Sequence, residues 1–277
     1  KIVDRWLQGK SLRGLHVGVS VVDTRTGDVW GSHQPDSLLN PASGTKLLTT
    51  AAALHLVPMR AGWETRLHGV VEGDALVGPL RLVGGGDPKL LLAHLERLAE
   101  SVVAAGITTI PAGLVVHAGY FDTEGLPPAY EQKQTDAGYR PRVGAAASNF
   151  GAVRVTVRPG KRHPQVTVEG GTGAVDVLVT TKMVKGSGQS VTIRAVQGKT
   201  GRTQILVGGQ LGRQAAPYDA RKRLYDPDLW TGDIVRSLLI ARGVTVGDGV
   251  SVTTDPLPEG AGPALSTVVS RTLPETL

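Results

Sequence analysis

The most constraining feature of this sequence is a Ser-x-x-Lys motif at the start of a long apolar segment. Asn40 is a good N-cap residue, and Pro41 follows at the first helical position, where its missing N–H costs nothing. Residues 47–57 are apolar on nearly every face, and Pro58 ends the segment. This pattern predicts a central, buried helix with the motif in its first turn.

Ser43 and Lys46 of this motif are one helical turn apart, so they share one face of the predicted helix. A serine hydroxyl becomes a good nucleophile when a neighbouring base takes its proton. A neutral lysine can be that base if burial or nearby cations lower its pKa. The N–H groups at the helix start favour negative charge near Ser43, and its own N–H can be one oxyanion donor. The motif predicts nucleophilic catalysis, and the alternative is a serine that only caps the helix.

The remainder of the chain has the pattern of mixed α and β structure. Residues 1–9 predict a short amphipathic helix, and residues 15–22 predict a strand followed by a turn. Beyond about residue 65, short strand-like segments alternate with glycine-rich turns, and longer helices are expected at about 89–105 and 228–242. The order predicts an α/β (α+β) chain in which a β-rich region follows a short opening. The expected strands of this region are residues 75–83, 113–117, 153–157, 166–168, 175–180, 191–196 and 204–207.

Charge and rare residue types argue against several kinds of site. The net charge is +6, but the densest basic cluster, residues 221–223, is flanked by Asp219 and Asp226 and accompanied by no nucleic-acid-binding motif. We therefore expect no nucleic-acid partner, whereas a mildly basic surface suits an anionic polymer. The chain has no cysteine, and its seven histidines are isolated, so neither a metal nor a cofactor is expected. No apolar segment approaches the roughly 18 residues of a membrane span.

Several further segments occur in the order typical of one enzyme family. Residues 84–88 read Gly-Gly-Gly-Asp-Pro, and residues 119–122 read Gly-Tyr-Phe-Asp. With these and the Ser-x-x-Lys at Ser43, the chain resembles the D-Ala-D-Ala carboxypeptidase/endopeptidase family of low-molecular-mass class C penicillin-binding proteins, peptidase family S13. The resemblance covers nearly the whole chain, in residues 17–30, 40–53, 84–88, 119–122, 143–160 and 223–246.

The resemblance implies a serine D,D-peptidase with Ser43 as the acylated nucleophile and Lys46 as its base. Its expected partners are peptidoglycan stem peptides and β-lactams. Its expected location is extracytoplasmic, in the periplasm or the cell-wall space, after removal of a signal peptide. Two alternatives are a non-catalytic peptidoglycan-binding or scaffold relative and an incomplete, inactive fragment of the enzyme. A β-lactamase is disfavoured because the inserted region is too large.

The resemblance also implies a division into domains. In the family, accessory domains interrupt the catalytic domain after its Ser-x-x-Lys helix. Residues 1–65 are therefore expected to be the N-terminal part of a partial β-lactamase/transpeptidase-like catalytic domain. Residues 66–260 are expected to form the inserted accessory region, with a β-rich subdomain at about 161–215, and residues 261–277 a return to the catalytic domain.

Two other catalytic motifs of the family are not found at their expected places. Asn40 and Asn149 are the only asparagines, and neither completes Ser-x-Asn, because Leu38 and Ala147 stand two positions before them. Ser148 directly precedes Asn149, which is the wrong spacing. Residues 199–201 read Lys-Thr-Gly, but they come before the family-like segment 223–246 instead of after it. A hairpin turn is the favoured interpretation of this Lys-Thr-Gly.

Residues 264–270 resemble the start of the helix that precedes Ser-x-Asn in the family. On this basis we expect that the natural protein continues beyond residue 277, and that the chain as given acylates slowly or not at all. Asp87, in the glycine-rich segment, is expected to form a turn and not to act as an acid.

The segment 127–142 corresponds to an accessory wall beside the active site, which reads the side chain of the peptide in the family. Tyr130 and Tyr139 are candidate substrate-binding residues there, together with Glu131 and Asp136. Tyrosine stands where the family often has tryptophan. An ordinary polar loop is the alternative.

Overall fold

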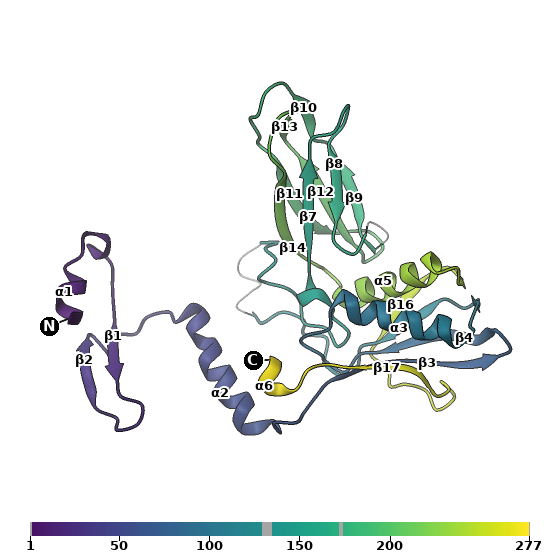
Figure 1. Cartoon of the computed structure of the whole chain (residues 1–277), viewed down its shortest axis with the longest axis horizontal. Helices are drawn as coiled ribbons and strands as arrows, with labels where there is room; N and C mark the ends of the chain where they lie inside the picture. Colours follow the sequence, from purple (N-terminus) through teal and green to yellow (C-terminus); the bar gives the residue numbers. More distant parts are fainter. Residues whose placement is uncertain (1, 129–134, 172–173, 277) are drawn as a thin grey trace. The chain divides into compact units, whose positions relative to one another are not determined.

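The computed structural model of the chain describes residues 2–128, 135–171 and 174–276 (Figure 1). The chain divides into two compact units, Lys1–Val57 and Pro58–Leu277. The mixed α/β architecture confirms the fold class expected from the sequence.

The first unit is a hairpin with short helices. Strands β1 and β2 pair antiparallel around the turn predicted at residues 23–28, where the Asp23 carboxylate accepts the N–H of Arg25 at 2.8 Å. The predicted helices at residues 1–9 and after Ser43 are both present. The elements are α1 (Ile2–Leu7), η1 (Lys10–Leu12), β1 (Val19–Val22), β2 (Val29–His33), η2 (Ala42–Gly44) and α2 (Thr45–Leu56).

The apolar helix α2 is exposed, which corrects the prediction that it is central and buried. Leu47, Leu48 and Leu56 are 76%, 73% and 76% exposed, and no described side chain of the first unit is buried. The physical reason is that a two-stranded hairpin and short helices offer no layer wide enough to cover a helix that is apolar on all faces. Each large side chain left in water forgoes about 1.5–3 kcal/mol of burial free energy.

The second unit is built around a seven-stranded mixed sheet. Its path is β15-β5-β4-β3-β17, and β6 joins β4 to β16. Strands β3, β4 and β17 pair antiparallel, whereas the other pairs are parallel. The strands are β3 (Glu64–Glu72), β4 (Ala75–Val83), β5 (Thr109–Ile110), β6 (Leu114–His117), β15 (Thr245–Val246), β16 (Val250–Thr253) and β17 (Ala264–Val269).

Two helices cover this sheet and contact each other. Helix α3 (Leu92–Ala104) contacts β17, and α5 (Pro227–Ala241) contacts β6, β15 and β16 (Figure 1). On α3, Leu95, Leu98 and Val102 are fully buried and share one face of the helix. They pack with Leu80 and Leu82 of β4 in the core.

A β-rich region lies between these two helices in the sequence. In β7, Val153, Val155 and Val157 are fully buried while Arg154 and Arg158 are exposed, so one face of the strand meets the core. The sheets have the orders β14-β7-β8, β11-β12-β9 and β10-β13. The strands are β7 (Ala152–Arg158), β8 (Gln165–Val168), β9 (Asp176–Val179), β10 (Lys182–Val184), β11 (Thr192–Gln197), β12 (Thr203–Gly208), β13 (Gln210–Gly212) and β14 (Tyr218–Arg223).

The prediction of a helix that starts within residues 264–270 is wrong, because residues 264–269 form strand β17. This strand pairs antiparallel with β3, from Ala264 opposite His68 to Val269 opposite Glu64. The β-branched side chains at 267–269 favour a strand, and Val268 is buried against the sheet. A short helix, α6 (Leu273–Thr276), follows the strand.

Candidate active site

The motif serine lies in a turn that precedes α2. The side chain of Asn40 accepts the N–H of Ala42 at 2.9 Å, and the carbonyl of Pro41 accepts the N–H of Gly44 at 2.7 Å. These bonds close a 3₁₀ turn in which Ala42 has a φ of +44°, and the α-helix itself begins at Thr45. The prediction that Asn40 caps the helix is wrong, because Gly44 is the N-cap of α2 and Asn40 bonds only to Ala42 in the preceding turn. Pro41 and Ser43 likewise lie before the α-helix and not in its first turn.

The side chains of Ser43 and Lys46 meet, as their spacing predicts. The Lys46 Nζ atom donates a hydrogen bond to Ser43 Oγ at 3.0 Å, and both residues are exposed. This distance is within the range required of a nucleophile and the base that takes its proton. Ser43 also lies where a helix start presents N–H groups that can stabilise a negative oxygen. The arrangement is chemically suited to acyl transfer.

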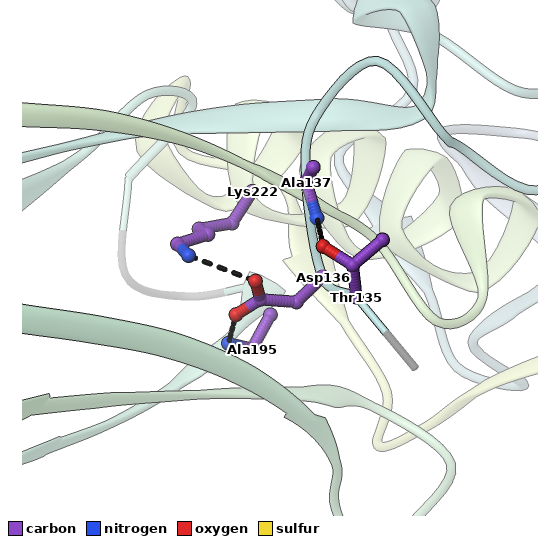
Figure 2. A network of polar contacts seen from close by, with 5 residues as sticks. All are labelled: Thr135, Asp136, Ala137, Ala195 and Lys222. Atoms are coloured by element: carbon purple, nitrogen blue, oxygen red, sulfur yellow. Dashed lines mark hydrogen bonds and ion pairs between the residues drawn. The ribbon is translucent and has the colours of Figure 1, made fainter. Parts of the chain in front are cut away.

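Asp136, named among the candidate substrate contacts, is hydrogen-bonded within the fold. One carboxylate oxygen accepts Lys222 Nζ at 2.9 Å, and the other accepts the Ala195 N–H at 2.7 Å (Figure 2). Burial raises the pKa of Asp136, but the bonds from Lys222 and Ala195 outweigh this and hold the pKa below its usual value. The carboxylate thus joins its own loop to β14 and β11.

The two tyrosines proposed to contact substrate have different positions. Tyr139 is 79% exposed, and the preceding Gly138 donates its N–H to the carbonyl of Arg221 at 3.2 Å. Tyr130, like Glu131, lies outside the residues that the structure describes. Tyr139 is therefore accessible to a ligand and supported on β14.

The Lys-Thr-Gly at residues 199–201 forms the hairpin turn that was predicted for it. It connects β11 and β12, whose last pair is Gln197 with Thr203. The Gly198 N–H donates to the Arg202 carbonyl at 2.8 Å, and Gly201 has a φ of +81°. This left-handed conformation is the usual reason for glycine in such a turn.

Ser148 and Asn149 have structural roles. The Ser148 hydroxyl is 2.8 Å from the hydroxyl of Thr231 on α5, and both are fully buried. The side-chain oxygen of Asn149 accepts the N–H of Leu92 at 3.3 Å, and the backbone N–H of Asn149 donates to the carbonyl of Leu90 at 2.8 Å. These bonds fasten the start of α3 and part of α5 to the segment before β7.

The glycine-rich turn at residues 84–88 brings backbone segments into direct contact. A Cβ atom on Gly84 would lie 2.4 Å from the backbone of Ala145, and one on Gly85 would lie 2.3 Å from that of Glu64. Asp87 is buried and accepts the N–H of Lys89 at 2.7 Å, as expected of a turn former, and burial raises its pKa. These glycines permit a close approach that no side chain would allow.

A buried carboxylate that the sequence did not reveal lines a hollow of about 330 Å³ at the start of α5. Asp228 is 9% exposed, and one of its oxygens accepts the N–H of Ala146 at 2.6 Å. Burial, with a smaller contribution from Asp226, raises the pKa of Asp228 to about 6. The only sequence signal was the Asp-Pro-Asp at residues 226–228, which resembles an ordinary helix start.

Within the described ranges, no group of three or more His, Cys, Asp or Glu side chains could hold a metal ion. Over the same residues, every helix is too short or too polar to cross a membrane.

Comparison with known proteins gives consistent matches. The model of the D-Ala-D-Ala carboxypeptidase 3 (S13) family matches residues 1–277. The D-alanyl-D-alanine carboxypeptidase of Actinomadura sp. (strain R39) is 29% identical over 258 residues, which are 90% of this chain and 48% of that protein. A carboxypeptidase of Mycobacterium tuberculosis is 29% identical over 163 residues, 54% of this chain and 34% of that protein. The chain thus spans about half, or less, of the length of these relatives.

Solved structures show the same fold at lower identity. Penicillin binding protein 4 from Haemophilus influenzae superposes with a TM-score of 0.73 at 20% identity, over 93% of this chain and 57% of that one. The same protein in complex with a β-lactam superposes with a TM-score of 0.67, over 93% of this chain and 56% of that one.

Proposed function

Because this chain belongs to the D-Ala-D-Ala carboxypeptidase 3 (S13) family, we propose that it carries the nucleophile and the base of a serine D,D-peptidase. The observation that carries the proposal is the 3.0 Å hydrogen bond between Lys46 Nζ and Ser43 Oγ at the start of α2. The proposed substrates are peptidoglycan stem peptides that end in D-Ala-D-Ala, and the proposed inhibitors are β-lactams. The names of the relatives, and the β-lactam bound to a structural neighbour, support these choices.

In the proposed reaction, Ser43 Oγ attacks the carbonyl carbon between the two D-alanines while Lys46 Nζ takes its proton. The backbone N–H of Ser43 donates to the negative oxygen that forms. The peptide C–N bond then breaks, the terminal D-alanine leaves with a proton, and an ester on Ser43 remains. Water hydrolyses this ester and restores the serine hydroxyl. The same attack on a β-lactam opens its ring and leaves a covalent adduct.

The proposed domain division assigns residues 1–65 to the catalytic domain and residues 66–260 to an inserted accessory region that includes the β-rich subdomain at about 161–215. The structure divides into two units between Val57 and Pro58, which supports a domain boundary near residue 65. Strand β17 pairs with β3 of the inserted region, so we place the return to the catalytic domain after Val269, within 261–277.

Two finer parts of the proposal concern substrate and location. Tyr139 is proposed to contact the side chain of the stem peptide, which its exposure permits. Tyr130 is proposed as a second substrate contact from the resemblance alone. The proposed location is outside the cytoplasmic membrane, in the periplasm or cell-wall space, where peptidoglycan lies.

The decisive experiment is intact-mass measurement after exposure of the purified protein to penicillin. We expect any adduct that forms, even slowly, to be single, to be lost in Ser43→Ala and to be kept in Ser37→Ala, a matched control because Ser37 is an exposed serine of the same unit. An adduct that persists in Ser43→Ala would overturn the assignment of the nucleophile. Absence of any adduct, with binding to peptidoglycan retained, would contradict acylation by this chain and favour one of the two alternatives, a scaffold relative or an incomplete, inactive fragment.

A further inference from the structure

The basic cluster at residues 221–223 is divided between the two faces of β14. Lys222 turns toward Asp136 and pairs with it at 2.9 Å (Figure 2). The Arg223 guanidinium lies 5.1 Å from the centre of the Tyr225 ring. Arg221 is exposed, and no ion pair is found for it among the described residues. Two of the three cations are therefore engaged by the fold, and Arg221 is available to a ligand.

A second unpaired arginine lies directly opposite Arg221. The antiparallel register of β14 and β7 aligns Arg221 with Arg154, which is also exposed and forms no ion pair within the described part of the chain. Like charges at directly opposite positions destabilise a strand pair. The nearby carboxylates of Glu169 and Asp219 accept the Arg154 N–H at 3.2 Å and the Thr156 hydroxyl, and within the described residues neither forms an ion pair with Arg154 or Arg221. An external anion between the two guanidinium groups would relieve this repulsion.

A strained aromatic residue, Phe150, lies near Arg221. Phe150 has a φ of +61° and is half-exposed, a rare conformation for a bulky residue. The fold maintains it through the bonds that Asn149 makes to Leu90 and Leu92. Strain that the surroundings enforce is a feature of functional sites, and here it holds an aromatic ring at the surface.

The ring of Phe150 is flanked by two cations. Lys89 Nζ and the Arg221 guanidinium carbon each lie 6.0 Å from the ring centroid, at the limit of cation–π contact. Lys89 is part-exposed and has no ion-pair partner in the described ranges. Lys89 and Arg221 thus border the ring, and Arg154 lies opposite Arg221 on the neighbouring strand, so the three cations come from three separate segments.

We propose that Lys89, Phe150, Arg154 and Arg221, here called the cationic surface, bind carboxylates of polymeric peptidoglycan away from the scissile bond. Guanidinium groups match the fork geometry of a carboxylate, and the ring offers an apolar face to the peptide or sugar beside it. Cations spread over three segments favour a polymer with repeated charges over a single small ion. The identity of the polymer rests on the proposed function, while the anionic chemistry rests on the surface alone. Phosphate-bearing wall polymers carry the same oxyanion chemistry and are separated in the test.

The test is cosedimentation of the protein with insoluble peptidoglycan, in the Ser43→Ala background so that the result does not depend on acylation. One arm uses peptidoglycan stripped of phosphate-bearing polymers, and the other uses wall material that retains them. The variant is Arg154→Gln with Arg221→Gln, and the control is Arg97→Gln, an exposed arginine of α3. We expect about a tenfold loss of affinity for the double variant on both materials, stronger at low salt, and no loss for the control.

A loss confined to phosphate-bearing wall material would overturn the carboxylate assignment, and equal binding by the double variant and the control would overturn the surface itself. Phe150→Leu is a second variant, because it removes the aromatic face without changing charge and should also weaken binding. Unchanged thermal unfolding of the variants shows that lost binding does not come from misfolding. Binding that depends on these residues in a protein that forms no penicillin adduct would support the surface and contradict only the proposed enzyme.

Discussion

Helices α2 and α3 are of similar length and differ sharply in what they bury. Helix α2 is apolar on nearly all faces and buries none of its residues, whereas α3 has a narrower apolar face and buries Leu95, Leu98, Ala99 and Val102. The first follows the candidate nucleophile, and the second belongs to the core of the larger unit. The comparison shows that apolar composition alone does not determine burial, which also requires a partner layer. It also implies that chemistry and folding stability can be perturbed separately in this chain.

The largest expected effect is on the rate of acylation at Ser43, with no matching effect on the stability of the core. In Lys46→Arg, the rate of β-lactam adduct formation should fall by a factor of about 10²–10⁴, because arginine stays protonated and cannot take the serine proton. Unfolding of the second unit should not change. The control is Lys10→Arg, an exposed lysine of the same unit, and time-resolved intact-mass measurement gives the rates. Near-normal acylation in Lys46→Arg would remove the lysine from the role of base.

The next effect compares the two helices directly. Leu95→Ala should lower the free energy of unfolding by about 2–5 kcal/mol, because it leaves a cavity at a fully buried site. Leu48→Ala, at a position that is 73% exposed, should change it by less than about 0.5 kcal/mol. Urea unfolding followed by circular dichroism measures both. Equal losses of unfolding free energy in Leu95→Ala and Leu48→Ala would contradict the difference between the two helices and show that α2 is covered in solution.

The smallest effect concerns pH and the buried carboxylate of α5. Burial raises the pKa of Asp228 from 3.8 to about 6, so the folded state binds its proton more tightly than the unfolded state. The contribution of this group to the unfolding free energy is therefore greatest below about pH 4 and falls by about 2–3 kcal/mol as pH rises to about 6 and above.

Asp228→Asn should remove this pH dependence, because asparagine has no charge to bury and can still accept the Ala146 N–H. Urea midpoints at pH 4.5 and pH 7.5 measure the difference, and Glu259→Gln, at an exposed position, is the control. The same pH dependence in Asp228→Asn and in the unmodified protein would contradict a buried, neutral Asp228.

The parts of the fold that could be predicted from the sequence are those with strong local periodicity. Helices α3 and α5 and strands β4, β7 and β12 lie within a few residues of their expected bounds, because each pairs a regular apolar pattern with a glycine or proline at one end. The contact of Lys46 with Ser43 was also predictable, because residues three positions apart meet in a 3₁₀ turn as well as in an α-helical one.

The parts that could not be predicted depend on partners distant in sequence. The Asp136 carboxylate meets Ala195 and Lys222, which lie 59 and 86 positions away, and no local pattern signals such a meeting. At strand β17 the family resemblance predicts a helix, against the strand preference of β-branched residues whose partner strand β3 lies far upstream. The exposure of α2 could not be predicted, because an apolar sequence does not reveal whether another element of the fold covers the helix.

The close backbone contacts of the glycine-rich turn limit how this region can change in evolution. Because a Cβ on Gly84 or Gly85 would collide with the backbone of Ala145 or Glu64, no single substitution at either position fits without moving a neighbouring segment. Variation there requires simultaneous change in segments about 60 and 20 positions away, which random mutation rarely supplies. Combinatorial libraries built on this chain should therefore keep both glycines fixed, and distant homologues should be recognisable by this pair even where the surrounding strands have diverged.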